Sequence, residues 1–304
     1  MNGLFIGLTT LDCLYQADHP PAANEKVVAA KSLLVAGGPA TNAAVAFAHL
    51  GRASGHKAML ASVLGEHSLT NLLREDLRGQ GVTLLDLDPA KLSPPPVSSI
   101  VVTAATGDRS VISHNAAGMQ VHAEQISPDI LTDVDIVLID GHQMAVGAQV
   151  AQWAKAKEIP VVVDAGSWKP GFETVLAWAD VAIASANFLP PHCLTTADVQ
   201  AYLKALNVPK IAITRGAQPI DYADAESSGE IEIPSVRAVD TLGAGDIFHG
   251  AFCHFYLAHT FTESLLKASR SASFACQYWG TRDWTKIYQI VDVKDEDKDE
   301  ASEK

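Results

Sequence analysis

This sequence has few cysteines and few positively charged residues. It lacks the common phosphate-binding loop G-x-x-x-x-G-K-[S/T] throughout its 304 residues. The 22 lysines and arginines are outnumbered by 35 aspartates and glutamates, which leaves a formal charge of −13. Such an acidic chain disfavours nucleic acid and anionic membranes as partners. The four cysteines form no C-x-x-C pair, which predicts free thiols in a reducing compartment: Cys13, Cys193, Cys253 and Cys276.

The sequence also lacks a targeting or membrane-spanning signal. Its N-terminus has no basic flank, and Asp12 interrupts the first apolar run, so we do not expect a signal peptide. The stretch Ser32–Leu50 is free of charge, but Gly37, Pro39 and Asn42 make it a poor spanning helix. We therefore expect a soluble, cytoplasmic protein.

Short apolar runs alternate with longer amphipathic stretches along most of the chain. The runs are continuously apolar, as in strands whose sheet is covered by helices on both faces. This alternation predicts an α/β fold with a doubly wound, mostly parallel sheet flanked by helices. The expected strands are Leu4–Leu8, Asp135–Asp140, Val161–Asp164, Val181–Ala184 and Ile211–Thr214. The expected helices are Pro39–Leu50, Leu69–Gln80, Val146–Lys157, Thr196–Leu206, Asp246–Ala258 and Thr262–Tyr278.

Two segments break the alternation. Glu25–Val35 and Val97–Ser113 look like strands of mixed polarity, and the second contains a turn signal at Gly107. We expect them to form a small β-sheet lid, from about residues 12–36 and 97–114, over the active cleft. No linker divides residues 1–291, which we read as one domain. The acidic segment 292–304 is expected to be a flexible tail.

The most informative motif is Asp240-Thr-Leu-Gly-Ala-Gly-Asp246, which runs directly into an apolar helix. Backbone N–H groups at a helix N-terminus lack intrahelical partners, and small residues let a phosphate approach them. A carboxylate beside a phosphate repels it, but is useful as a base that takes the proton of an attacking hydroxyl. The motif therefore predicts phosphoryl transfer to an alcohol. The alternative is a glycine-rich turn with an aspartate that stabilises the helix end.

The motif resembles the D-T-x-G-A-G-D signature of the phosphofructokinase-B, or ribokinase, family of carbohydrate kinases, at every fixed position. The resemblance implies a ribokinase-like fold in which Asp246 is the catalytic base. It implies an anion hole formed by the N–H groups of Gly243, Ala244 and Gly245. It also places Asp240 near a monovalent-cation site, for which K⁺ is the candidate, with Gly280 as a further backbone contributor.

Substrate contacts are expected in the first fifty residues. Gly37, Gly38 and Asn42 match a Gly-Gly pair followed by Asn in the family, where glycines admit a sugar and the amide binds its hydroxyls. Asp12 follows the first strand and would accept hydrogen bonds from a diol. Helix punctuation and a turn aspartate are the alternative interpretations of these residues.

Two further residues are candidate substrate contacts. Asp140 follows a predicted strand, together with His142, where relatives place a polar contact. A helix N-cap is an equally good account of Asp140. Arg109 lies on the predicted lid, where it would reach a charged substituent or the transferred phosphate; the alternative is an exposed surface arginine.

The residues expected to contact ATP are assigned from the family resemblance. Thr214 and Gly216 match a strand ending in T-x-G whose Thr and Gly contact ATP, and Ser269 matches a nucleotide-contacting position, although a plain helix-face serine is the alternative. Asn187 matches the Asn of the family's N-x-x-E motif, but Pro190 replaces its Glu. That Glu organises Mg²⁺ and water around the phosphates, so Pro190 bears on the metal arrangement.

The predicted function is ATP-dependent phosphorylation of a sugar hydroxyl, with Mg²⁺ as cofactor. Adenosine-type nucleoside kinases share the core and lid and are the alternative enzyme. A catalytically silent nucleotide- or sugar-binding regulator is the alternative from another class, to which Pro190 points and against which Asp246 argues. Because lid strands leave unpaired edges, a homodimer through the lids is expected.

Overall fold

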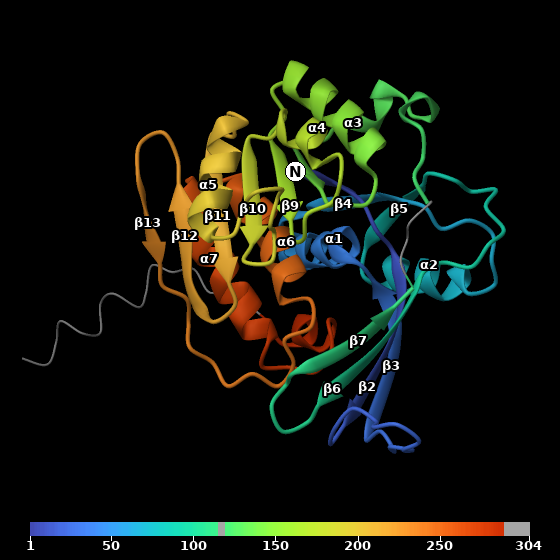
Figure 1. Ribbon diagram of the computed structural model, residues 1–304. Coiled ribbons are helices and arrows are strands. Elements are labelled where there is room, and N and C mark those ends of the chain that lie inside the picture. The colour runs from blue at the N-terminus through green and yellow to red at the C-terminus, as the bar shows by residue number, and fades with distance from the viewer. Residues whose placement is uncertain (115–118, 289–304) are drawn as a thin grey trace, which may run out of the picture.

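The computed structural model describes residues 1–114 and 119–288, so the acidic tail 292–304 lies outside the described residues. Its centre is a nine-stranded sheet in the order β13-β12-β11-β10-β9-β8-β1-β4-β5 (Figure 1). The pairs from β11 to β5 are parallel, whereas β12 and β13 join antiparallel at one edge. The strands are β1 Asn2–Ile6, β4 Lys57–Ser62, β5 Val82–Asp86, β8 Ile136–Ile139, β9 Val161–Ala165, β10 Val181–Ser185, β11 Lys210–Arg215, β12 Gln218–Ala223 and β13 Ser228–Ile231.

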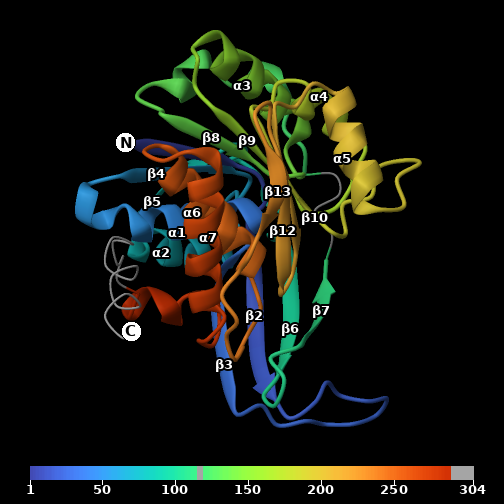
Figure 2. The ribbon, with the colours of Figure 1, turned by 90° about the vertical axis from the view of Figure 1, so that its left-hand side faces the viewer.

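Helices cover both faces of this sheet (Figure 2). One face packs on α1, α2, α6 and α7, and the other on α3, α4 and α5, with a separate apolar cluster on each side. The central strands β8 and β9 are buried along their whole length, as the continuous apolar runs predict. The helices are α1 Pro39–Leu50, α2 Thr70–Gly79, α3 Met144–Ala156, α4 Phe172–Leu176, α5 Thr196–Ala205, α6 Ala244–Tyr256 and α7 Phe261–Ala275.

A separate four-stranded sheet in the order β3-β2-β6-β7 projects from the edge of the core (Figure 1). Its strands are β2 Thr10–Ala17, β3 Lys31–Gly37, β6 Val97–Thr103 and β7 Arg109–Ser113. This sheet confirms the predicted secondary sheet, and we call it the lid. One cluster of apolar side chains, including Leu14, Ile100 and Trp279, attaches the lid to the C-terminal part of the chain.

Two details of the predicted lid were wrong. The strand expected from Glu25 begins only at Lys31; Glu25 lies in a turn, where its N–H donates to the Ala22 carbonyl oxygen at 3.1 Å. Asp12 does not simply follow the first strand. It lies inside β2, an unpredicted strand that pairs with both β3 and β6.

No helix within 1–114 or 119–288 is long and apolar enough to cross a membrane. The uncharged stretch Ser32–Leu50 is divided between β3 and α1, with Gly38 at the junction. Gly38 has a φ of 101°, a backbone conformation that favours glycine, and a Cβ there would lie 2.3 Å from the carbonyl oxygen of Leu8.

Candidate active site

The Asp240–Asp246 motif forms a loop that turns into α6. Gly243 takes a left-handed conformation with φ 70°, and α6 begins at Ala244. The first intrahelical bond runs from Ile247 N–H to Gly243 O at 2.8 Å. Within the described residues, the N–H groups of Gly245 and Asp246 have no protein acceptor, and that of Ala244 makes only a 3.3 Å contact to Thr241 O. The helix therefore begins with N–H groups that are available to an anion.

The carboxylate of Asp246 lies beside these N–H groups and is held by Asn42 of α1. Asn42 Nδ2 donates to Asp246 Oδ2 at 2.8 Å, across 204 residues of sequence. Burial and the charge of Asp164 raise the pKa of Asp246 to about 7, although the Asn42 hydrogen bond and the charge of His249 oppose the rise. A carboxyl group with this pKa changes protonation state near neutral pH, which suits a general base.

Asn42 is in turn fixed by Arg282, a residue that the sequence did not single out. Arg282 Nη1 donates to Asn42 Oδ1 at 3.0 Å, and both side chains are buried. No local motif marks Arg282, since its partners come from α1, from α2 and from the end of β3. Only the folded chain brings them together.

A second missed group lies behind the base. His249 is one helical turn beyond Asp246, and its Nε2 lies 3.6 Å from Asp164 Oδ1 at the end of β9. Its Nδ1 contacts the Gly245 carbonyl oxygen at 2.7 Å. The pair places a second buried carboxylate close enough to Asp246 to affect its pKa.

Asp12 and the two glycines meet beside α1. Asp12 is buried, and its Oδ1 accepts the Thr10 hydroxyl at 2.6 Å. The Cα of Gly37 lies against this carboxylate so closely that a Cβ would be 1.8 Å from Asp12 Oδ2. Loss of hydration raises the pKa of Asp12 above its ordinary value. Asn42, Gly38 and Asp12 are thus placed at the junction of lid and core, where the sequence predicts the sugar.

Asp140 accepts hydrogen bonds from three backbone N–H groups but is not a helix N-cap, since α1 has Gly38 and α3 has Gln143 at that position. Its Oδ2 accepts the N–H of Leu8 at 2.9 Å and of Ala40, in the first turn of α1, at 3.1 Å. Its Oδ1 accepts the backbone N–H of His142 at 2.8 Å. Burial works to raise the pKa of Asp140, but the charge of His142 and these donors outweigh it and hold the pKa below its ordinary value. The carboxylate therefore joins three loops at the sheet edge.

The carboxyl ends of the central strands open into a cavity of about 290 Å³. Asp140 and Asn187 line it, together with Asp164 and Lys169, of which Lys169 is a cation that the sequence analysis missed. This position fits the rule that ligands of doubly wound sheets bind at the carboxyl ends of the strands.

The other predicted nucleotide contacts lie at the end of β11 and inside α7. Thr214 lies near the end of β11, opposite Ser185 of β10, and Gly216 follows in a left-handed turn with φ 64°. Ser269 is buried in α7, and its hydroxyl donates to the Leu266 carbonyl oxygen at 2.8 Å. The Ser269 hydroxyl hydrogen is thus committed to its own helix.

The lid and the C-terminal turn both contact the motif loop. Arg109 Nη1 of β7 donates to the Thr241 hydroxyl at 3.0 Å. Asp240 is buried, and its two oxygens accept the N–H groups of Leu242 and Gly280, each at 2.9 Å. Burial raises the pKa of Asp240. No Lys, Arg or His in the described part of the chain forms an ion pair with it.

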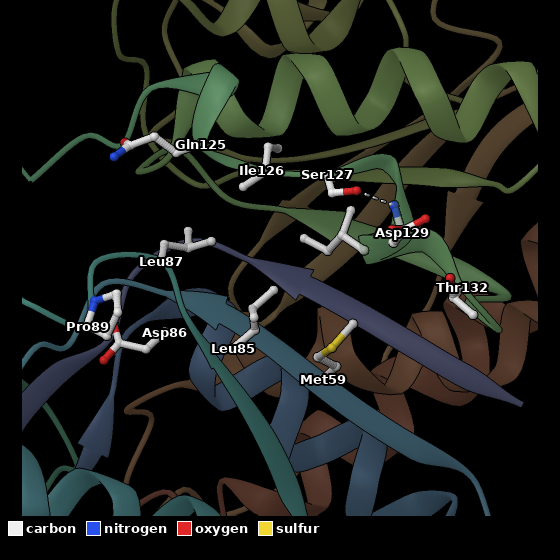
Figure 3. Close-up of a pocket in the computed structure, with 11 residues that line it drawn as sticks. Met59, Leu85, Asp86, Leu87, Pro89, Gln125, Ile126, Ser127, Asp129 and Thr132 are labelled. Carbon is white, nitrogen blue, oxygen red and sulfur yellow. Dashed lines mark hydrogen bonds between the residues drawn. The ribbon is translucent and has the colours of Figure 1, made fainter.

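A larger cavity, of about 540 Å³, lies elsewhere (Figure 3). It is formed by β4, β5 and the segment 125–132, with Met59, Leu85 and Leu87 on one wall and Ile126 on the other. None of the predicted site residues lines it. Size alone therefore does not locate the active site in this molecule; the clustered carboxylates and helix N-terminus do.

A carboxylate beside the N-terminus of a helix, in a doubly wound sheet with a small second sheet, fits a phosphotransferase site. Residues 4–287 match the family described as pfkB family carbohydrate kinase. The chain belongs to this family, and it is a carbohydrate kinase, a phosphotransferase with an alcohol group as acceptor.

The chain is also similar to individual relatives in sequence and to several solved structures in fold. The chain is 28% identical over 295 residues to a ribokinase of Bacillus subtilis, covering 92% of this chain and 94% of the relative. Its fold is that of a putative ribokinase from Agrobacterium tumefaciens, with TM-score 0.80, 24% identity and 92% of each chain covered. Arabidopsis thaliana ribokinase complexed with ribose and ATP gives a TM-score of 0.72, 21% identity and coverage of 95% and 99%. An adenosine kinase from Sinorhizobium meliloti has the same fold, with TM-score 0.74, 17% identity and coverage of 92% and 95%.

Proposed function

We propose that this kinase transfers the γ-phosphoryl group of ATP to a hydroxyl of a ribose- or fructose-like sugar, with Asp246 as the general base. One observation carries the proposal. Burial raises the pKa of Asp246 to about 7, and its carboxylate lies where the N–H groups of Gly245 and Asp246 have no acceptor among the described residues. A proton acceptor and an anion site are thus side by side, as an alcohol attacking a phosphate requires.

The sugar would lie at the junction of lid and core. Asp12 would accept hydrogen bonds from its hydroxyls, Asn42 would offer its remaining amide hydrogen, and Gly37 and Gly38 would let backbone approach the ring. Asp246 would take the proton of the attacking hydroxyl as the bond to phosphorus forms and the bond to the ADP oxygen breaks. The Gly243, Ala244 and Gly245 N–H groups would hold the developing charge, each contributing roughly 3 kcal/mol to the barrier.

ATP would extend from this anion hole across the strand ends toward Thr214 and Gly216. The Arabidopsis ribokinase structure holds ribose and ATP together, which supports two adjacent sites. Magnesium supplies charge neutralisation on the phosphates in such reactions. Among the residues that the structure describes, no group of three or more His, Cys, Asp and Glu side chains could hold a metal ion. Magnesium would thus be held chiefly by the phosphates, with Asn187 beside them.

Asp240 fits the cation role that the family resemblance implies. It is a buried carboxylate whose pKa is raised by burial, although the charge of Arg109 opposes the rise; among the described residues it has backbone donors but no ion pair. A potassium ion there would supply the missing positive charge. Rates measured in K⁺ and in a bulky organic cation at equal ionic strength test this, and equal rates would remove the cation from the proposal.

Asp246→Asn is the decisive variant. We expect it to abolish turnover while ATP binding, measured by calorimetry, persists, because the amide keeps the shape but cannot accept the proton. A near-normal rate at saturating acceptor would show that another group is the base.

The acceptor is identified by an ADP-coupled assay over aldopentoses, ketohexoses, phosphorylated or sulfonated sugars and nucleosides. A sugar with the highest kcat/KM supports the proposal. Preference for adenosine assigns the chain to the nucleoside kinases, and no turnover with any acceptor, while ATP still binds, indicates a silent regulator.

A further inference from the structure

Arg282 connects the proposed base to three other parts of the chain. It follows α7 and its guanidinium is buried, with Nη1 donating to Asn42 Oδ1 and to Thr281 Oγ1, each at 3.0 Å. Nη2 donates to the Ala36 carbonyl oxygen at the end of β3 and to Asp76 Oδ2 of α2 at 3.3 Å. Burying a guanidinium is costly unless its charge and its N–H groups find partners.

We propose that Arg282 is a positioning residue for phosphoryl transfer, which fixes the Asn42 amide so that its N–H group faces Asp246. The inference rests on the proposed function, because it concerns the group that acts as base there. Arg282 does not touch the reacting atoms in this arrangement; it acts through Asn42.

The donor pattern of Arg282 explains why it selects one orientation. A side-chain amide has two orientations, related by a half turn that exchanges its oxygen and its NH₂ group. Guanidinium carries only donors, so it binds the amide oxygen and excludes the NH₂ group from its side. The NH₂ group of Asn42 must then point the other way, where Asp246 Oδ2 accepts it at 2.8 Å.

The Nη2 group of Arg282 fixes the position of the guanidinium. Asp76 Oδ2 accepts the Ala36 N–H at 3.0 Å, while Arg282 donates to the carbonyl oxygen of the same residue. Arg282 and Asp76 together hold both backbone groups of Ala36, immediately before Gly37. The guanidinium is therefore anchored at the base of the lid as well as at the site.

This arrangement sets how readily Asp246 is deprotonated. The charged groups that face Asp246 are Asp164 from β9, His249 from α6, Asp12 from β2 and Arg282. Two of them are carboxylates, which oppose ionisation of Asp246. The Asn42 donation and the positive charge of Arg282 favour ionisation, so removal of Arg282 shifts the balance toward the protonated, inactive form.

The test is the pH dependence of kcat for Arg282→Met, which keeps length and burial but has no donors. We expect the acid limb of the profile to move up by about one pH unit. At neutral pH kcat falls on the order of tenfold or more, recovers in part toward alkaline pH, and leaves KM for ATP unchanged. Arg74→Met is the matched control, since Arg74 makes a comparable ion pair with Asp86 away from the site.

A double-mutant cycle separates positioning from general damage. In an Asn42→Ala background, Arg282→Met should cost clearly less kcat than it does in the wild type, because only the direct effect of the Arg282 charge on Asp246 is then left to lose. Additive losses, or a loss equal at every pH, overturn the inference. If Arg282→Met does not fold, Arg282→Lys takes its place: one ammonium retains the charge but cannot reach Asn42 and Ala36 together, and a wild-type profile for it overturns the inference equally.

The two levels of proposal fail differently. If Asp246→Asn keeps its activity, the proposed base is wrong and with it everything that depends on it. If Asp246→Asn is inactive but the cycle is additive, Asp246 remains the base and only the role of Arg282 is withdrawn.

Discussion

A carboxyl group serves as a base in water only if it is ionised often enough and holds the proton tightly enough. Asp246 combines these requirements, because reduced hydration and Asp164 raise its pKa to about 7 while Asn42 keeps the ionised form accessible. An ordinary surface aspartate would take up a proton far less readily at neutral pH. The surroundings of Asp246, rather than its residue type, therefore suit it to proton transfer.

The raised pKa predicts two effects of pH on Asp246. Since the ionised form is the base, kcat should rise with pH and level off above about 7. Since folding favours the protonated form, Asp246 contributes to the free energy of unfolding. This contribution is fully present below the ordinary pKa of 3.8 and is lost as the pH rises to about 7. Asp246→Asn, which is never charged, should raise the thermal unfolding midpoint above neutral pH and leave it unchanged at the acidic end.

Scanning calorimetry of wild type and Asp246→Asn across this pH range checks the second effect. A constant difference in unfolding midpoint from acid to alkaline pH would contradict the raised pKa. The same buffers serve for the kcat profile, so both effects are read from one protein preparation.

Gly37 gives a prediction about the sugar site. In Gly37→Ala the new Cβ must displace the Asp12 carboxylate, which is buried and cannot retreat into solvent. We expect KM for the sugar to rise about tenfold or more, since one charge-assisted contact is lost, with ATP affinity unchanged. Gly79→Ala is the control, because a Cβ there meets no atom within 4 Å. Equal KM values for the two variants would place the sugar elsewhere.

Site residues differed in how well sequence could find them. Asp246 and the glycines beside it are contiguous, so their pattern is visible in a one-dimensional string. Arg282 has no such pattern: its partner Asn42 is 240 residues away, and its role exists only after folding. The hydrogen bonds of Asp140 likewise depend on Leu8 and Ala40, which the sequence does not place near it.

At the scale of elements, α1 and α6 pack closely enough to bring Asn42 to Asp246. Gly250 of α6 permits this approach, since a Cβ there would lie 2.1 Å from the Ala43 carbonyl oxygen of α1. The hydrogen bond between Asn42 and Asp246 is therefore a consequence of helix spacing. A change that separates the helices should break it without touching either residue.

Gly250→Ala tests this spacing. We expect a stability loss of about 1–3 kcal/mol from overpacking, together with a lower kcat in the folded protein. Gly147→Ala is the matched control: its Cβ would lie 2.7 Å from Ile139 Cγ2, so it strains α3 against the sheet but not the site. Urea unfolding and steady-state kinetics compare the two. A normal kcat in Gly250→Ala would show that the spacing has no catalytic role.

Helices whose first and last residues favour a helix end were predicted well. The expected helix Pro39–Leu50 coincides with α1, because Pro39 begins it and Gly51 ends it. The parallel strands β1, β8, β9, β10 and β11 were also found from their apolar runs, whereas the parallel strands β4 and β5 were not predicted. Likewise, β13 was not predicted, because Ser228–Ile231 is polar and largely exposed and forms only by pairing with β12. Edge strands of this kind are specified by a partner rather than by their own residues.

At the scale of the whole molecule, several large apolar side chains of the lid are exposed to solvent. Leu34 on β3 and Ile112 on β7 are 56% and 79% exposed, and Val111 and Tyr15 are also exposed. The lid strands at its two sides, β3 and β7, are edges. Exposed apolar edges favour pairing with another chain, so we propose that the protein is a homodimer through its lids.

Ile112→Glu should therefore convert the dimer to a monomer in light scattering, because a charge at the interface opposes association. Leu194→Glu is the control, since Leu194 is 86% exposed in the loop before α5, far from the lid in sequence. We expect it to keep the wild-type mass. A monomeric wild type, or an Ile112→Glu variant of unchanged mass, contradicts the lid dimer.

The bond between Asn42 and Asp246, and the one between Asn42 and Arg282, have a consequence for synthesis of the chain. During translation, the early strands and α1 are synthesised long before the ribosome reaches the codon for Arg282. The growing polypeptide thus contains Asn42 and Asp246 before it contains the arginine that holds the Asn42 side chain. A product that ends between Asp246 and Arg282 would contain the proposed base but not the guanidinium that fixes Asn42, so we expect such a truncated chain to transfer phosphoryl groups more slowly than the full sequence.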